Sequence, residues 1–200
     1  MKARFYILPL AAVIASACSG AASPTAPSGT LSRAASSHKF EAISAGYLLT
    51  MPVAGLAEFR VDSARVFSMP GGDVDTARGF NLAVYDSSGS MLQPVRSFET
   101  RDDALGANAR DFVAALNDVP DRAVVMISVA DESGLTVMES CTHKNTPDTA
   151  AVESALRALG SSLIGNYCYR NSWSMIAVKG AGVKDEQLSK IDRVTSRYSS

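Results

Sequence analysis

The chain has 200 residues, 46% of them hydrophobic, and its 19 basic and 20 acidic residues give a formal net charge of −1. Because there is no basic excess, the electrostatic attraction that drives nucleic-acid binding is missing, and we exclude a nucleic-acid partner. The length suffices for one domain with a proper hydrophobic core, and no internal repeat or second linker divides the sequence.

The N-terminus has the three parts of a secretory signal peptide. The first four residues carry two positive charges, residues 5–15 are apolar, and small residues precede Cys18. The apolar run is shorter than the roughly 20 residues that span a bilayer. Two small residues directly before a cysteine resemble the lipobox of bacterial lipoproteins, which predicts removal of residues 1–17 and lipidation of Cys18. Ordinary cleavage after Ala17 is the alternative, since the A-x-A pattern also suits signal peptidase I.

Residues 18–38 are predicted to be the lipidated cysteine and a flexible linker. Serine, alanine, proline, glycine and threonine dominate this segment, which has almost no large apolar side chains. Such a segment cannot bury enough apolar surface to offset the entropy of ordering the chain. We therefore expect a tether that leads to one folded domain over residues 39–184, followed by a polar C-terminal tail over residues 185–200.

The folded part is predicted to mix strands and helices. Alternating or continuously apolar runs of strand length predict strands, and apolar residues at helical spacing predict helices. The expected strands are 40–46, 57–64, 79–85, 91–98, 123–129 and 174–179, and the expected helices are 102–116 and 149–159. The polar residues 185–198 are compatible with a further helix.

The cysteines favour one disulfide. If Cys18 carries lipid, Cys141 and Cys168 remain, and an even number in an exported domain predicts that they pair. Two free thiols are one alternative. A nucleophilic or metal site at Cys141 and His143 is another, but no third ligand is apparent, so we expect no metal.

The segment 159–180 is the strongest candidate for a binding site. It leads from a helix end through a turn into a strand, a junction where binding residues are often displayed, and it contains Arg170 and the only tryptophan, Trp173. Asp131 follows directly after the apolar run 123–129. An arginine, an aspartate and an exposed aromatic ring together suit a sugar, because the ring stacks on its apolar face while the charged groups bond its hydroxyls. The alternative is an Arg170–Asp131 ion pair between two loops, with Trp173 in the core.

Hydrolase chemistry at Asp131 and Glu132 is the third possibility. Adjacent residues on a strand point to opposite faces, which does not suit a reaction that needs two carboxylates flanking one bond. We therefore expect no enzymatic activity and no cofactor.

Five segments, taken in order, resemble a known family. They are residues 40–46 (FEAISAG), 78–84 (RGFNLAV), 131–134 (DESG), 159–161 (LGS) and 169–173 (YRNSW) with 178–180 (VKG). Their letters and spacing resemble the interleukin-like epithelial–mesenchymal-transition inducer domain over about residues 39–184. The resemblance implies an α+β fold, a β-β-α sandwich with two packed sheets flanked by short helices.

The resemblance also implies a function. In a glycosyltransferase stem, a domain of this family is a noncatalytic module that binds β-linked N-acetylglucosamine. Asp131 and Arg170, together with Arg78, match its ligand-contacting positions, whereas Asn171 stands where the family more usually has aspartate. We expect a noncatalytic, extracytoplasmic glycan-binding domain, exported and lipid-anchored to a bacterial membrane, with Trp173 in its site. The alternative is a structural or protein-interaction module of the cell envelope whose partner is an envelope protein.

Overall fold

A computed structural model describes residues 37–47, 54–70, 78–101 and 106–200, all within the compact unit Ala35–Ser200. The predicted signal peptide, Cys18 and nearly all of the predicted linker lie outside the described residues. Among the described residues, no helix is both long and apolar enough to cross a bilayer.

Nine strands form one mixed hydrogen-bonded sheet in the described ranges. Five of them follow the order β5–β4–β6–β7–β8, with bounds β4 Gly79–Tyr85, β5 Met91–Glu99, β6 Val124–Asp131, β7 Ser172–Val178 and β8 Gly182–Ser189. The other four follow the order β3–β2–β1–β9, with bounds β1 Lys39–Tyr47, β2 Ala54–Val61, β3 Ala64–Pro70 and β9 Val194–Ser199. Every residue of β4 and β6 is buried, as their apolar sequences predict.

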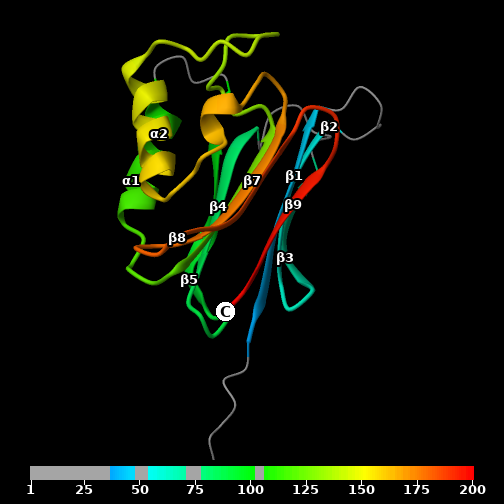
Figure 1. Ribbon diagram of the computed structural model, residues 1–200, viewed down its shortest axis with the longest axis vertical. Helices are drawn as coiled ribbons and strands as arrows, with labels where there is room; N and C mark the ends of the chain where they lie inside the picture. The colour runs from blue at the N-terminus through cyan, green and yellow to red at the C-terminus, as the bar shows by residue number, and fades with distance from the viewer. Residues whose placement is uncertain (1–36, 48–53, 71–77, 102–105) are drawn as a thin grey trace, which may run out of the picture. The chain divides into compact units, whose positions relative to one another are not determined.

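The strands β1 and β6 join these two groups. They pair in parallel at only two positions, Ala45 with Ala130 and Gly46 with Asp131, whereas the other strand pairs are antiparallel. Figure 1 shows β1, β9 and β3 on one side of the β4–β8 group and the helices on its other side. Apolar side chains such as Phe40 and Phe59 pack against Met126 in a core between the two groups of strands.

The predicted fold class is therefore wrong. An α+β sandwich of two separate sheets was expected, and the protein instead has a β-rich fold in which a single mixed sheet carries two α-helices among the described residues. One physical reason is that the C-terminal polar residues form strands. The other is the pairing of β1 with β6, which makes the sheet continuous.

Helices α1 (Ala107–Asn117) and α2 (Pro147–Ala158) pack together over one face of the β4–β8 group (Figure 1). Their apolar faces close a second core that contains Phe80, Phe112 and Trp173. Helix α2 begins two residues before the expected 149: the Thr146 hydroxyl accepts a hydrogen bond from the Thr149 backbone N–H (3.2 Å), and Pro147 follows the cap. A single 3-10 turn, η1 (Ile164–Asn166), leads from α2 towards β7.

Two other expectations also need correction. The predicted strand 57–64 crosses a turn: Asp62 and Ser63 both have positive φ and separate β2 from β3. Mirror-image hairpin turns usually carry glycine or asparagine, so this Asp-Ser pair gave no turn signal. The tail 185–198 is not helical, because its polar residues alternate with half-buried ones along β8 and β9.

The two ends of the described domain lie together, at one end of β1. Lys39 pairs with Ser199, and the Ser200 N–H donates to the His38 carbonyl (3.0 Å). Gly46, at the other end of β1, pairs with Asp131. At about 3.3 Å per residue, this places Asp131 roughly 23 Å along the strand from the chain ends.

Candidate functional site

Three arginines converge on the carboxylate of Asp131, the last residue of β6. Arg78 Nε lies 3.3 Å from Asp131 Oδ2, Arg101 Nη1 lies 3.8 Å from the same oxygen, and Arg170 Nε lies 3.5 Å from Oδ1. The arginines come from the segment before β4, the end of β5 and the turn before β7. The Asp131 side chain is 7% exposed, whereas those of the arginines are 22–30% exposed. The carboxylate is thus a buried centre from which three cationic side chains reach solvent.

The backbone at this cluster is held in an unusual conformation. Asp131 and Arg170 have φ values of 58° and 60°, a left-handed region that L side chains adopt only at some cost. Two glycines make room for these turns. A Cβ at Gly46 would lie 1.9 Å from the Arg170 carbonyl oxygen, and one at Gly55 would lie 2.7 Å from the Asp131 nitrogen. The surrounding sheet therefore fixes the backbone positions from which the Asp131 and Arg170 side chains extend.

Glu132 supports the turn that carries Arg170. It is 2% exposed, and its Oε2 accepts a hydrogen bond from the Arg170 backbone N–H (2.7 Å) while its Oε1 accepts one from Gly134 N–H (2.9 Å). Burial raises the pKa of Glu132, against the opposing effect of these two donors. Burial also raises the pKa of the neighbouring Tyr167. Glu132 thus acts on Arg170 through the backbone.

The predicted disulfide between Cys141 and Cys168 is confirmed. It ties the loop after β6 to the turn before β7, and the Tyr169 N–H donates to the Ser140 carbonyl beside it (2.9 Å). His143 has structural partners: its Nδ1 bonds Glu153, and its Nε2 lies 2.9 Å from the Tyr167 carbonyl oxygen. No cluster of three metal-ligating side chains occurs among the described residues.

A shallow depression of about 160 Å³ opens beside the Asp131 cluster. Its walls come from the loop after β6, the end of β5 and the turn before β7. The lining residues are Arg101, Glu132, Gly134, Thr136, Met138, Lys144 and Tyr169. The Arg170 guanidinium lies over the ring of Tyr169, 5.0 Å from its centroid. This surface combines cations, a hydroxyl group and a half-buried aromatic ring.

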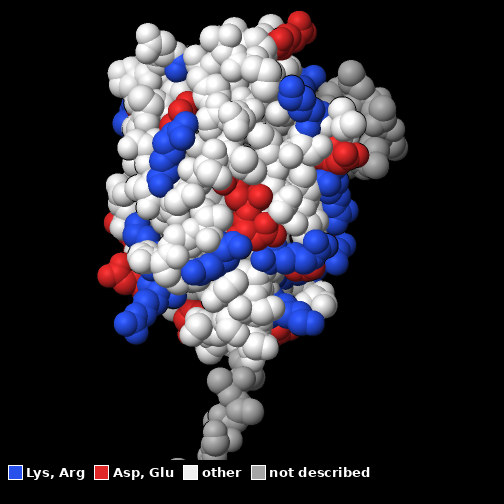
Figure 2. Space-filling model, in the orientation of Figure 1, with Lys and Arg blue, Asp and Glu red and all other residues white. Residues whose placement is uncertain are grey.

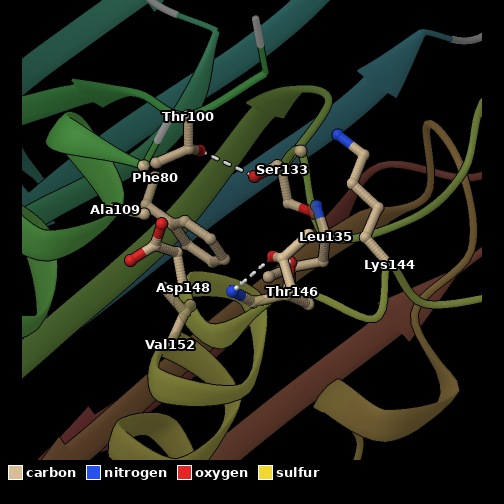
Figure 3. A pocket seen from close by; sticks show the side chains of 12 residues that line it. Phe80, Thr100, Ala109, Ser133, Leu135, Lys144, Thr146, Asp148 and Val152 are labelled. Carbon is tan, nitrogen blue, oxygen red and sulfur yellow. Dashed lines mark hydrogen bonds between the residues drawn. The ribbon is translucent and has the colours of Figure 1, made fainter. Parts of the chain in front are cut away.

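A second pocket lies next to this depression, between the two helices and the loop after β6 (Figure 3). Phe80 forms its floor, Asp148 stands at one side, and the Thr100 hydroxyl donates to the Ser133 carbonyl across its upper edge (2.7 Å). Its volume of about 50 Å³ has room for a few waters rather than a sugar ring. We therefore place the candidate ligand surface at the Asp131 cluster and its depression.

The structure brings together three of the four ligand-binding residues expected from the sequence. Arg78, Asp131 and Arg170 meet, but Trp173 is completely buried. Its indole N–H donates to Glu186 Oε1 (3.0 Å), and its ring packs edge-on against Phe80. The expectation that Trp173 stacks on a ligand is therefore wrong, because both faces of β7 are covered at this position. The structure shows the alternative, an Arg170–Asp131 ion pair with Trp173 in the core.

Sequence reasoning missed Arg101 and Tyr169. Tyr169 adjoins Arg170 in the segment 169–173, which carries part of the family resemblance, and could have been noticed there. Arg101 offered no local signal, since only the pairing of β4 with β5 brings the end of β5 to Arg78. Figure 2 shows acidic and basic side chains interspersed on the face that carries β8 and β9, without a large area of one sign.

The arrangement described above defines a β-rich domain in which three arginines and one aspartate gather at one end of the sheet. The family model for the interleukin-like EMT inducer matches residues 78–181, a span that contains Arg78, Asp131 and Arg170. The chain belongs to this family. Protein FAM3C of Xenopus tropicalis is similar, with 26% identity over 133 residues, which cover 65% of this chain and 51% of that protein. The chain thus spans about half the length of the relative it matches. The family and the disulfide are both consistent with an exported domain.

Proposed function

We propose that this domain is a noncatalytic, extracytoplasmic binding module that recognises a glycan at the Asp131 cluster. The observation that carries the proposal is the convergence of Arg78, Arg101 and Arg170 on one buried carboxylate beside a half-buried tyrosine ring. Three separate chain segments hold this arrangement, and two of its residues have left-handed backbone conformations. Such conformations cost free energy that a simple ion pair between two loops would not need.

The chemistry of the cluster suits sugar hydroxyls. A hydroxyl both donates and accepts, so a carboxylate and guanidinium groups fixed side by side can bond the two hydroxyls of a vicinal pair. Tyr169 takes the place that Trp173 was expected to fill, because its ring is partly exposed next to Arg170. A rigid site of this kind loses little conformational entropy when it binds.

Lipid attachment at Cys18 is part of the same proposal. The predicted linker would enter the domain at residue 38, beside Ser200 and about one strand length from Asp131. A membrane anchor at that end would leave the glycan surface accessible. Labelling cells with a fatty acid tests the anchor: the label should disappear in Cys18→Ala, and persistent labelling would refute lipidation at this residue.

Calorimetric titration with N-acetylglucosamine-containing oligosaccharides tests glycan binding. We expect saturable binding by the wild type and at least a tenfold weaker affinity for Arg170→Ala. The matched control is Arg197→Ala, since Arg197 pairs with Glu41 on the β9–β1 ladder, away from the site. Absence of binding by the wild type, or equal binding by Arg170→Ala, would refute the proposal that the domain binds a glycan at this cluster.

A protein-interaction module is the second candidate, and one observation favours it. Val137 and Met138 are 47% and 70% exposed in the loop that the disulfide fixes. Exposed apolar side chains on a rigid loop are typical of protein contacts. A purified stoichiometric partner whose binding is lost in Met138→Ser, in the absence of any glycan affinity, would support this candidate over the first.

A further inference from the structure

Two polar groups in the depression beside Asp131 lack hydrogen-bond acceptors among the described residues. Thr136 is 2% exposed, yet its hydroxyl has no hydrogen-bond partner. The Lys144 ammonium, in the same wall, forms no hydrogen bond or close ion pair with any residue that the structure describes, although its charge acts on the buried Glu132 carboxylate. A buried hydroxyl without a hydrogen-bond partner is energetically costly, so its presence at a surface depression points to a bound group.

The loop after β6 holds these two residues in fixed positions. Thr136 forms a β-bridge with His143, and the Lys144 N–H donates to the Leu135 carbonyl (2.8 Å). The disulfide at Cys141 then ties the tip of this loop to the turn before β7. Thr136 and Lys144 therefore come from neighbouring arms of one short, cross-linked hairpin, and their spacing is set before any ligand arrives.

The other polar groups of the wall leave the depression rich in donors. Glu132 turns both carboxylate oxygens to the backbone N–H groups of Arg170 and Gly134. Figure 3 shows the Lys144 side chain running past Leu135, with its ammonium end directed away from Phe80 and Asp148. That end belongs to the depression whose walls also include Arg101 and Tyr169. The Lys144 ammonium and the Thr136 hydroxyl, which have no hydrogen-bond acceptor here, suit a negatively charged oxygen group.

We propose that this depression is a subsite for an acidic sugar, whose carboxylate or sulfate group pairs with Lys144 and accepts the Thr136 hydroxyl hydrogen bond. The sugar ring lies against Tyr169, between Lys144 and the Asp131 cluster. The volume of about 160 Å³ is below the roughly 300–1,000 Å³ typical of sites for drug-sized ligands, so the subsite takes one ring. This inference rests on the proposed glycan-binding function and specifies its ligand class.

Calorimetry with three matched oligosaccharides tests the subsite. One is neutral and contains N-acetylglucosamine, the second carries glucuronate in place of one neutral ring, and the third carries a sulfate on one ring. We expect at least one acidic ligand to bind about tenfold more tightly than the neutral one at low salt, and this preference to shrink as salt screens the charges. The ligand with the stronger preference identifies carboxylate or sulfate as the recognised group.

Two variants assign the preference to these residues. Lys144→Gln should reduce the acidic preference to within twofold while leaving the neutral affinity nearly unchanged. Thr136→Val should weaken the acidic ligand about three- to fivefold. Lys184→Gln is the matched control, because it removes the same charge at an exposed position of β8 and should keep the full preference. Unchanged melting temperatures exclude a folding effect.

The possible failures are distinct. Equal affinity of the wild type for neutral and acidic ligands would overturn the acidic subsite and leave glycan binding intact. An acidic preference that survives in Lys144→Gln would also overturn it. Absence of binding to all three ligands would overturn the proposed function and the subsite together.

Discussion

Ser44 and Ser128 each donate a hydroxyl hydrogen bond to the strand that carries the other. Ser44 Oγ donates to the Val129 carbonyl on β6 (2.6 Å), and Ser128 Oγ donates to the Ile43 carbonyl on β1 (2.5 Å). Ser44 also accepts the Trp173 N–H from β7 (3.0 Å). Both serines are completely buried. Side-chain hydroxyls therefore extend the two-residue backbone pairing that joins the two groups of strands.

Removal of either hydroxyl should destabilise the protein. Ser44→Ala leaves the Val129 carbonyl and the Trp173 N–H without this partner in a dry interior, so we expect a loss of about 1–3 kcal/mol in the free energy of unfolding. Ser128→Ala should cost a similar amount. Urea unfolding measures both, with Ser199→Ala at an exposed position of β9 as the control. Losses below about 0.5 kcal/mol in both variants would contradict the role given to these serines.

The disulfide should contribute strongly to stability. Cys141 and Cys168 are separated by 27 residues, and the chain-entropy model gives about 3–4 kcal/mol for a crosslink of this span. Urea unfolding with and without reductant should show this difference for the wild type. A variant with both cysteines changed to alanine should match the reduced wild type and ignore the reductant. Equal urea midpoints for the oxidised and the reduced wild type would contradict a stabilising role of the disulfide.

Glu132 should make stability depend on pH. Its pKa is raised above the usual 4.5 because burial disfavours the charged carboxylate. The folded protein thus holds this proton more tightly than the unfolded chain. The resulting stabilisation is complete below about pH 4.5 and is lost as the pH rises through the folded-state pKa.

Glu132→Gln removes this pH dependence. In the variant, an amide NH2 group stands in place of one of the two oxygens that accept hydrogen bonds from the Arg170 and Gly134 N–H groups, so one of these bonds is lost. The variant should therefore be less stable at low pH by about 1–3 kcal/mol. Its deficit relative to the wild type should shrink as the pH rises from about 4 to 7. Urea unfolding across this range measures the difference, and a deficit that grows with pH would show that the folded-state pKa is lowered instead.

Gly46 should tolerate no side chain. A Cβ there would lie 1.9 Å from the Arg170 carbonyl oxygen, so Gly46→Ala must displace the turn that carries Arg170. We expect a loss of about 1–3 kcal/mol in unfolding free energy, with weaker glycan binding in parallel. Gly165→Ala is the control, because its Cβ would meet only the movable end of the Arg157 side chain. A stable Gly46→Ala protein with normal binding would contradict this account.

Elements with a strong local pattern were predictable from the sequence. The bounds of β4 match the expected 79–85, and the apolar run 123–129 lies within β6 apart from its first residue. Helix α2 was found because Val152 and Leu156 repeat at helical spacing. In these elements, burial of one helix face or of a whole strand produces a hydrophobic pattern that can be read from the sequence.

What depended on distant contacts was not predictable. The polar residues of β9 pair with β1 across more than half of the chain, so their sequence alone gave no strand signal. The continuous sheet depends on buried serines, a residue type that ordinarily predicts turns or surface. At the candidate site, the resemblance pointed to Asp131 and Arg170, but the burial of Trp173 depends on distant segments that cover both faces of β7.

The hydrogen bond between Ser200 and His38 has a practical consequence for engineering. Because the chain enters and leaves the domain at adjacent points, the whole unit could be inserted into an exposed loop of a carrier protein through two short connectors. The same closeness allows a circular permutant that joins residue 200 to residue 38 and opens between Asp86 and Ser90, in the exposed turn between β4 and β5. Both rearrangements leave the arginine cluster untouched, so the proposed binding site could be transferred intact to another protein scaffold.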